Sequence, residues 1–485
     1  MTISDIKAAT GNTIENALSR YHKGCLAAAD TIVGKALSFP IPEPNDIIRR
    51  YYAVSDISFH ELGELGGRRV IGLNLMRNAG TRTTKTFASL SIVARAAEHV
   101  RRTGERIIII TPTSGNKGTA LRDAVARAYA TGLATPASLR IVTVLPMSSR
   151  NKLRRCSDLA AEELRQINPV AFVAGGAAEV KELARRTADQ FAADRTLRGG
   201  WRIWYTLDLD NYRVADAVRA FAEAEYAPIT ANSPPRWHVH AVSSAYGLLG
   251  YHLGHSVLSG GKVLGLPVPA AHPGFLLVQH LATPDMVLSL ATGSFSRAGV
   301  PNYRWDPIAA AWRQDSDPRF PAITASPQEE IDSTFYTSMP PTSAAMDDLV
   351  ALHGGGGIVV SRRECYDRYA QIRDFAAPFG ADVPEDPAKL REWSLVMALC
   401  GVLIAHERSL LPMDTDVVVH ASGCYTDDNL PPMPPGHAVL VNGDEDLHGV
   451  ILRALRLCRA CQTAALHEGE ACIVPCSSQK FTVPG

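Results

Sequence analysis

The sequence predicts an α/β protein in which parallel β-sheets are flanked by helices. One observation is a set of short, continuously apolar runs such as Ile107–Ile110 and Val170–Val173. Such runs are typical of strands that are buried on both faces of a parallel sheet. A second observation is that stretches with helical apolar spacing alternate with these runs, as the crossovers between parallel strands require.

Length and composition narrow the classes of function. The chain has 485 residues, room for two or three domains, and its 46% apolar content is ample for large cores. The 49 basic residues balance the 49 acidic ones. Because no net field attracts a polyanion, we expect neither nucleic acid nor an anionic membrane as a partner.

Targeting signals and cysteine usage predict the compartment. The N-terminus lacks the basic start and apolar run of a signal peptide. The longest apolar stretch, about residues 393–405, is too short to span a bilayer and predicts a buried helix. Nine scattered cysteines fit a reducing environment better than a disulfide framework. We therefore expect a soluble, cytoplasmic protein.

The first motif lies where a predicted loop runs into a helix. Residues 1–60 form a mainly helical extension, broken by prolines at 40, 42 and 44, and a strand follows at 69–75. The next helix carries an apolar stripe from Phe87 to Ala97, so Lys85 stands at its start. Most lysines are simply solvated. A lysine near helix amino ends, however, tends towards the neutral amine that a Schiff base needs.

The second motif follows the strand at 106–110. Thr111-Pro112-Thr113-Ser114-Gly115-Asn116-Lys117-Gly118 reads as a tight loop that opens the next helix. The first amides of a helix favour an anion, and ligands gather at the carboxyl ends of parallel strands. An ordinary strand–turn–helix connection is the alternative.

Together these motifs resemble the fold-type II pyridoxal-phosphate (PLP) enzymes, which include cysteine synthase, serine dehydratase, tryptophan synthase β and threonine synthase. The motifs are most similar to those of threonine synthase: residues 80–88 resemble its Gly-x-Thr-x-x-Phe-Lys-Asp-Phe-Ala stretch around the cofactor lysine, and a Ser-Gly-Asn-x-Gly loop starts at Ser114, 29 residues after Lys85. The resemblance implies a two-domain, tryptophan synthase β-like α/β fold with parallel sheets flanked by helices. It also implies PLP as the cofactor and a homodimer.

The resemblance also assigns roles to residues. Lys85 would form the Schiff base and then act as the base at the substrate Cα. Asn116 would lie beside the ring hydroxyl of the cofactor, and Thr113, Ser114 and Gly115 would receive the substrate carboxylate. Lys117 stands where the family usually has threonine. This extra cation leads us to hypothesise a substrate with an additional acidic group.

The order of elements predicts the domains. Residues 106–205 would form the smaller, mobile domain. The larger, PLP-binding domain would comprise 61–105 and 206–450, with an irregular insertion at about 299–345. Residues 451–485 would be a C-terminal tail.

Two later loops compete for the cofactor phosphate. A strand at 237–242 leads into small and hydroxyl residues and a helix start, which suits a phosphate and matches the family's phosphate loop in order. We assign this role to Ser243, Ser244, Ala245, Tyr246 and Gly247. The rival, residues 290–297, is interpreted as a substrate-side loop with Arg297 as an anion clamp, and a surface turn is its alternative.

The end of the chain contains two further signals. The strand at 416–421 ends at Ser422, and the family places a hydroxyl there, facing the pyridine nitrogen. A strand-end turn is the alternative. Cys458, Cys461, Cys472 and Cys476 have a spacing compatible with zinc, but the helical apolar spacing around Cys458 favours core positions, so we predict no metal site.

The sequence thus predicts a PLP-dependent lyase or carbon–heteroatom synthase. It would catalyse elimination or replacement at the β or γ carbon of an amino acid, as a threonine synthase-like biosynthetic enzyme with an acidic or phosphorylated substrate. A non-catalytic PLP-binding regulatory protein of the same fold is the alternative. An unrelated α/β enzyme is the third possibility.

Overall fold

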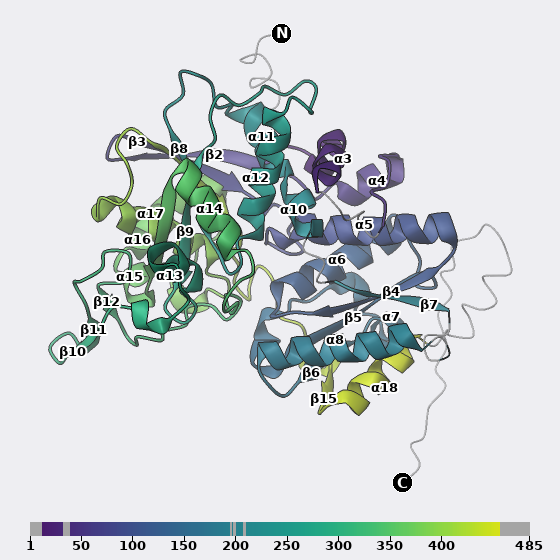
Figure 1. The fold of residues 1–485 in the computed structure, drawn as a ribbon. Coiled ribbons are helices and arrows are strands. Elements are labelled where there is room, and N and C mark those ends of the chain that lie inside the picture. Colours follow the sequence, from purple (N-terminus) through teal and green to yellow (C-terminus); the bar gives the residue numbers. More distant parts are fainter. Residues whose placement is uncertain (1–11, 33–38, 195, 197–199, 207–209, 456–485) are drawn as a thin grey trace.

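The structure, a computed structural model, describes residues 12–32, 39–194, 196, 200–206 and 210–455. Two α/β domains lie side by side, each built on its own sheet (Figure 1). This arrangement confirms the predicted parallel sheets flanked by helices.

The larger domain contains a seven-stranded sheet in the order β1-β2-β3-β14-β8-β9-β13. The strands from β3 to β13 are parallel, whereas β1 and β2 pair antiparallel at one edge. Their bounds are β1 (Thr13–Ile14), β2 (Ile57–Leu65), β3 (Arg68–Asn74), β14 (Asp416–Ala421), β8 (Arg236–Ala241), β9 (Gly274–His280) and β13 (Gly355–Val360).

Two layers of helices cover this sheet because successive strand residues face opposite ways. On one face Leu73, Phe275 and Val418 pack with α2 (Ala17–Arg20), α3 (His22–Thr31), α4 (Asp46–Tyr52), α5 (Lys85–Thr103), α10 (Asp210–Asp216), α11 (Val218–Tyr226) and α12 (Tyr246–Ser259). The other face packs against α15 (Arg362–Asp367), α16 (Tyr369–Ala376) and α17 (Ser394–Glu407). α17 is the buried helix predicted near residues 393–405.

The smaller domain contains a five-stranded parallel sheet in the order β15-β6-β5-β4-β7. The strands are β4 (Arg106–Pro112), β5 (Leu139–Pro146), β6 (Val170–Val173), β7 (Trp201–Tyr205) and β15 (Val439–Val441). Its helices are α6 (Asn116–Ala130), α7 (Glu162–Ile167), α8 (Ala177–Ala193) and α18 (Asp444–Leu455).

The two ends of the described chain differ from the predicted domains. Residues 439–450, expected in the larger domain, lie in the smaller one: β15 pairs with β6, and α18 buries Leu447 and Ile451 in the small-domain core. Pairing with β15 covers the otherwise open edge of β6. The N-terminal extension is part of the larger domain, because β1 pairs with β2 and Leu18 joins its core.

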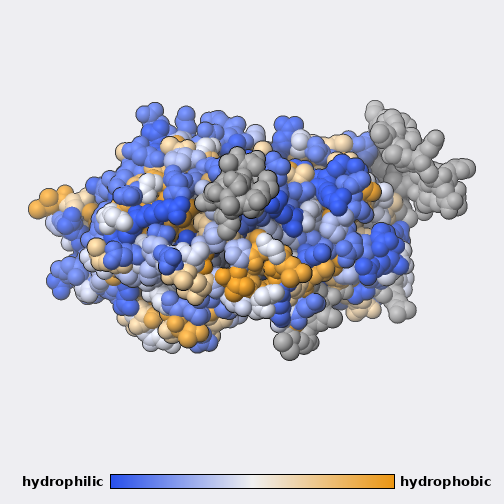
Figure 2. All heavy atoms as spheres, turned by 90° about the horizontal axis from the view of Figure 1, so that it is seen from above, coloured by the Kyte–Doolittle hydropathy of each residue, from blue (hydrophilic) through white to orange (hydrophobic). Residues whose placement is uncertain are grey.

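The insertion at 299–345 carries a small antiparallel sheet of β10 (Arg304–Asp306), β11 (Ala311–Arg313) and β12 (Ile323–Thr324). Two helices flank the insertion, α13 (Asp285–Thr292) before it and α14 (Ser343–His353) at its end. Figure 2 shows a face that is largely hydrophilic, with one apolar patch near its middle. Among the described residues, no helix combines the length and apolarity needed to cross a membrane.

Candidate active site

A cavity of about 410 Å³ lies between the two domains, at the carboxyl ends of β3, β4, β8 and β14. Most of the predicted site residues line it: Lys85, Thr113, Ser114, Asn116, Lys117, Ser243, Ser244, Ala245, Tyr246, Gly247 and Ser422. Lys85 and Ser422, which are 337 positions apart in the sequence, therefore meet in one site. The volume is within the usual range for small-molecule pockets.

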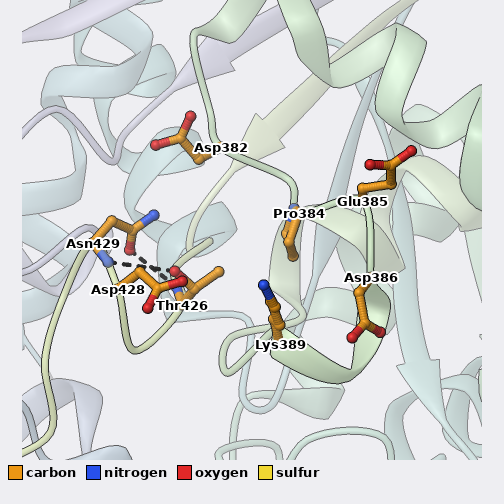
Figure 3. A pocket seen from close by; sticks show the side chains of 8 residues that line it. All are labelled: Asp382, Pro384, Glu385, Asp386, Lys389, Thr426, Asp428 and Asn429. Atoms are coloured by element: carbon orange, nitrogen blue, oxygen red, sulfur yellow. Dashed lines mark hydrogen bonds between the residues drawn. The ribbon is translucent and has the colours of Figure 1, made fainter.

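Two other hollows contain none of the predicted residues. Figure 3 shows one of them, which is lined by Lys389 together with the acidic residues Asp382, Glu385, Asp386 and Asp428. The second lies between α8 and the start of α18.

Lys85 begins α5 and lines the cavity with its half-buried side chain. Burial lowers the pKa of the Lys85 amine, and the nearby Arg219 guanidinium lowers it further, while Asp216 and Glu392 act in the opposite direction. Since burial disfavours the charged form, the site promotes the neutral, nucleophilic amine.

Asn116 begins α6 and is held by partners from the larger domain. Its side-chain amide donates to the Glu392 carboxylate at 2.5 Å, and its carbonyl oxygen accepts from Tyr425 Oη at 2.8 Å. These two bonds fix the amide orientation. One of the two amide hydrogens remains for a ligand.

The loop before Asn116 depends on one glycine and one hydroxyl. Gly115 has a φ of +135°, and the backbone of Lys152 lies 2.9 Å from the position that a Cβ would take, so only glycine fits. Thr113 Oγ1 accepts from the amides of Gly115 and Gly118 at 3.0 and 2.9 Å. Thr113 therefore shapes the loop, while Ser114 and Lys117 line the cavity.

The cavity lining is strongly cationic. Lys117 at the start of α6, Lys181 and Arg185 on α8, and Arg219 on α11 all line it with Lys85. No aspartate or glutamate is among the described lining residues. Burial, together with Lys181 and Lys85, lowers the pKa of Lys117 to about 7.

The predicted phosphate loop opens α12. Ala245 is the N-cap with a φ of +50°, and the helix starts at Tyr246, so its first amides point at the cavity end of the loop. Ser243 Oγ donates to Thr337 Oγ1 at 2.8 Å, and the Ser244 carbonyl accepts from Thr342 at 2.7 Å. The two serines thus attach the insertion to the loop.

Arg219 supplies a cation beside this loop. The position of a Cβ on Gly247 would lie 2.5 Å from its Nη1, so the guanidinium packs directly against the loop. Its Nη2 donates to Asp216 and to Thr84 Oγ1, both at 2.7 Å. The guanidinium is therefore rigidly held, with its positive charge next to the start of α12.

Arg219 also contacts a row of buried histidines. Arg219 Nη1 donates to His420 Nδ1 at 3.1 Å, and because arginine only donates, His420 Nε2 carries the hydrogen towards His238 Nδ1 at 2.7 Å. His238 Nε2 in turn lies 3.3 Å from Glu223. The two rings thus lie in a row between a buried cation and a buried carboxylate.

Some predicted residues lie elsewhere or outside the described residues. Arg297 is not among the lining residues: its guanidinium donates to the Leu281 carbonyl at 2.8 Å, so it braces a loop and the predicted clamp role is not supported. Residues 290–297 are the end of α13 and an exposed turn. Cys458, Cys461, Cys472 and Cys476 lie outside the described residues, and within the described ranges no metal-binding group of three or more ligands occurs.

Sequence reasoning missed several cavity residues. Arg219, His240, Lys181 and Tyr212 belong to helices or strands whose patterns gave no motif. The insertion, interpreted as irregular, contributes Thr334, Phe335, Tyr336, Thr337 and Pro341 to the lining. The Pro-rich character of that segment was the only available signal.

The lining residues fit PLP. The α12 start and Arg219 suit a phosphate, Asn116 suits the ring hydroxyl, and Lys85 suits the aldehyde carbon. Two buried polar atoms facing the cavity, Tyr212 Oη and His240 Nε2, have no hydrogen-bond partner among the described residues. Buried polar atoms of this kind are satisfied by ordered water or by a bound ligand, so both are available to hold one.

The fold and the site together define the class of protein: a two-domain α/β protein with parallel sheets flanked by helices and a cavity between the domains. The chain itself belongs to a family described as "Family of unknown function (DUF6002)", which it matches over residues 7–455.

Solved structures with a similar fold include threonine synthase from Escherichia coli, at 14% identity and a TM-score of 0.49, over 90% of this chain and 96% of that one. Cysteine synthase from Entamoeba histolytica aligns at 12% identity and a TM-score of 0.45, over 86% and 98%. A pyridoxal 5'-phosphate-dependent aspartate racemase aligns at 14% identity and 0.45, over 84% and 97%. No curated protein matches the sequence. The argument about function therefore rests on the site residues.

Proposed function

We propose that this protein is a PLP-dependent enzyme that catalyses elimination or replacement at the β or γ carbon of an amino acid. The single observation that carries the proposal is the half-buried amine of Lys85, whose pKa is lowered, in one cavity with the start of α12 and with Asn116. A lowered amine pKa favours the neutral form that covalent attachment of PLP requires, and the helix start beside it suits the cofactor phosphate.

Some of the lining residues would bind the cofactor, and others would bind the substrate. Lys85 would hold the cofactor covalently, the α12 amides and Arg219 would bind its phosphate, and Asn116 would bind its ring hydroxyl. Ser422, at the end of β14, would meet the ring nitrogen. Bound PLP supplies an electron sink for charge that develops at the substrate Cα.

Lys85 would also move the proton. When it is not bound to the cofactor, the Lys85 amine would lie in the cavity and would take the proton from the substrate Cα. The loop from Ser114 to Lys117, at the start of α6, presents helix amides to the substrate carboxylate. Burial between the domains excludes water during this transfer.

The charge of the cavity supports a substrate with a second anionic group, acidic or phosphorylated. Lys117 and Lys181 remain after the cofactor phosphate and one carboxylate have been assigned their partners, and Arg185 lines the same side from α8. Like charges that are packed without counter-ions are costly, so an anionic substrate would stabilise this arrangement.

Reductive trapping tests the covalent role of Lys85. Purified protein is incubated with PLP, reduced with borohydride, digested and analysed by mass spectrometry. We expect the modified peptide to contain Lys85 in wild type and in Lys117→Ala, and no modified cavity peptide in Lys85→Ala. Because Lys117 lines the same cavity, Lys117→Ala is a matched control for nonspecific labelling. Labelling that persists in Lys85→Ala would refute the assignment.

A further inference from the structure

His240 is a buried histidine on β8 whose side chain lines the interdomain cavity. It is only 7% exposed. Its Nδ1 lies 2.7 Å from the carbonyl oxygen of Ala241, whereas its Nε2 has no hydrogen-bond partner among the described residues. One ring nitrogen is therefore satisfied by the protein and the other is not.

The protein fixes the tautomer of this ring. A carbonyl oxygen only accepts, so Nδ1 must carry the hydrogen, and Nε2 presents a lone pair. Burial, with the positive charges of Arg219 and Lys85, holds the pKa of His240 well below its usual value, so the ring is neutral. Nε2 of His240 is therefore a hydrogen-bond acceptor of fixed orientation that has no donor within the described part of the chain.

The neighbouring histidines, His238 and His420, have different partners. His420 uses both ring nitrogens, one towards Arg219 at 3.1 Å and one towards His238 at 2.7 Å. The remaining nitrogen of His238 lies 3.3 Å from the Glu223 carboxylate. Nε2 of His238 also has no hydrogen-bond partner among the described residues, but of the three histidines only His240 lines the cavity, so its unpaired nitrogen is the one beside a ligand.

The position of His240 restricts the donor. β8 pairs with β14 in register at Val239 and Val419, so His240 and Ser422 end neighbouring strands at the cavity. The cations Lys85 and Arg219 already line this region. A ligand with a protonated nitrogen can donate a hydrogen bond to His240 Nε2. An anionic oxygen cannot, and the lone pair of Nε2 would repel it.

We infer that His240 Nε2 accepts a hydrogen bond from a protonated nitrogen of the ligand bound in this cavity. The inference rests on the proposed function, which supplies two sources of this chemistry: the ring nitrogen of the cofactor and the amine of the amino acid. His240 is then a binding residue that selects the protonation state of that nitrogen.

The test compares His240→Phe, which removes the acceptor, with His240→Gln, whose amide oxygen restores one. Without ligand, His240→Phe is expected to unfold at the same temperature as wild type or higher, because a buried unpaired acceptor has been removed. Its affinity for ligand should nevertheless fall about tenfold, and His240→Gln should recover most of the loss.

Two binding measurements identify the source. If the cofactor ring is the donor, the dissociation constant of PLP itself rises in His240→Phe, and the ¹⁵N chemical shift of ring-labelled cofactor moves towards the unprotonated value. If the amine is the donor, PLP binding is unchanged, and the dissociation constant of L-serine for the PLP-loaded protein rises instead.

His255 offers a matched control, since it is 4% exposed and its Nε2 is paired with the Ala271 carbonyl at 3.1 Å. His255→Phe should lower thermal stability and leave both dissociation constants within twofold. If the His240→Phe protein binds PLP and L-serine as wild type does, or loses stability as His255→Phe does, the inference about His240 is overturned. The proposed function is not affected by either outcome. A wild-type protein that binds no PLP would overturn the proposed function and the inference with it.

Discussion

At the residue scale, Lys117 shows how a single side chain sets the character of the site. It lies at the start of α6, half-buried, in the same cavity as Lys85 and Lys181. Burial is the main cause that lowers its pKa to about 7, and the two other lysines add to it. Near neutral pH a substantial fraction of the ammonium form is therefore present to bind an anion.

This pKa predicts a pH-dependent preference for anionic amino acids. Below pH 7 Lys117 is charged, and as the pH rises through about 7 the free site loses this charge. L-cysteate, whose sulfonate stays ionised, should therefore bind about tenfold more tightly than L-serine at pH 6, and the ratio should fall towards pH 9. Spectral titration of the PLP-loaded protein measures both dissociation constants.

Lys117→Met should abolish both the preference and its pH dependence. Substitution of Lys23, which is exposed and lies outside the cavity lining, is the control and should leave both unchanged. An equal ratio in wild type and Lys117→Met at every pH would show that Lys117 does not recognise a second acidic group.

At the element scale, the part of the insertion between residues 332 and 342 connects the two domains across the cavity. Asp332 forms an ion pair with Lys152 of the smaller domain at 2.7 Å, and the exposure of the two side chains is 0% and 13%. Tyr336 lies under the ammonium group of Lys181, 4.5 Å from the ring centre. Thr337 and Thr342 bond to Ser243 and Ser244 of the phosphate loop. We call residues 332–342 the strap, because they bridge the two domains over the cavity.

The ion pair of the strap should contribute measurably to stability. Asp332→Asn keeps the acceptor for the amide of Thr334 but removes the carboxylate that pairs with the Lys152 ammonium group, which retains only the weaker compensation of the Arg391 carbonyl and of nearby Glu392. We expect it to lower the free energy of unfolding in urea by about 3 kcal/mol. The double variant Asp332→Asn/Lys152→Met, which removes both charges, should be more stable than the additive sum of the two single variants.

Additive effects of the two substitutions would show that the ion pair does not couple the strap to the smaller domain. Arg363→Met is a suitable control, because its ion pair with Asp367 is exposed and within one helix. That substitution should change stability by less than about 1 kcal/mol.

At the scale of the whole molecule, the chain passes between the domains more often than the sequence predicted. After β14 it returns to the smaller domain, where β15 extends the sheet beside β6 and α18 packs on its core. Arg140, fully buried in the smaller domain, donates to the carbonyl oxygen of Ala454 on α18. The smaller domain is therefore complete only when the end of the described chain has folded onto it.

This topology predicts that α18 stabilises the smaller domain. Ile451 is fully buried in its core, so Ile451→Ala should lower the free energy of unfolding by about 2–4 kcal/mol. Leu440 on β15 is 55% exposed, and Leu440→Ala is the matched control, with an expected change below about 1 kcal/mol. Equal, small effects of both substitutions would contradict the packing of α18 on this core.

Local pattern was sufficient for much of the fold. The apolar runs that predicted strands became β4, β5, β6 and β14, because an uninterrupted apolar run has few alternatives to a buried parallel strand. Lys85, Asn116 and Ser422 line one cavity as expected, since loops at the carboxyl ends of parallel strands meet. The assignment of Arg297 failed because a loop of suitable composition carries no information about the direction in which it faces.

The sequence by itself determined the α/β class, the loops at the strand ends and the lysine at the start of α5, because each is a property of adjacent residues. Only the tertiary structure decided the rest: Arg219 beside Gly247, the strap bridging both domains, the return of β15 to the smaller sheet, and the unpaired nitrogen of His240. These features depend on contacts between residues far apart in the chain. Burial and pairing at such contacts are fixed by packing, which no local pattern encodes.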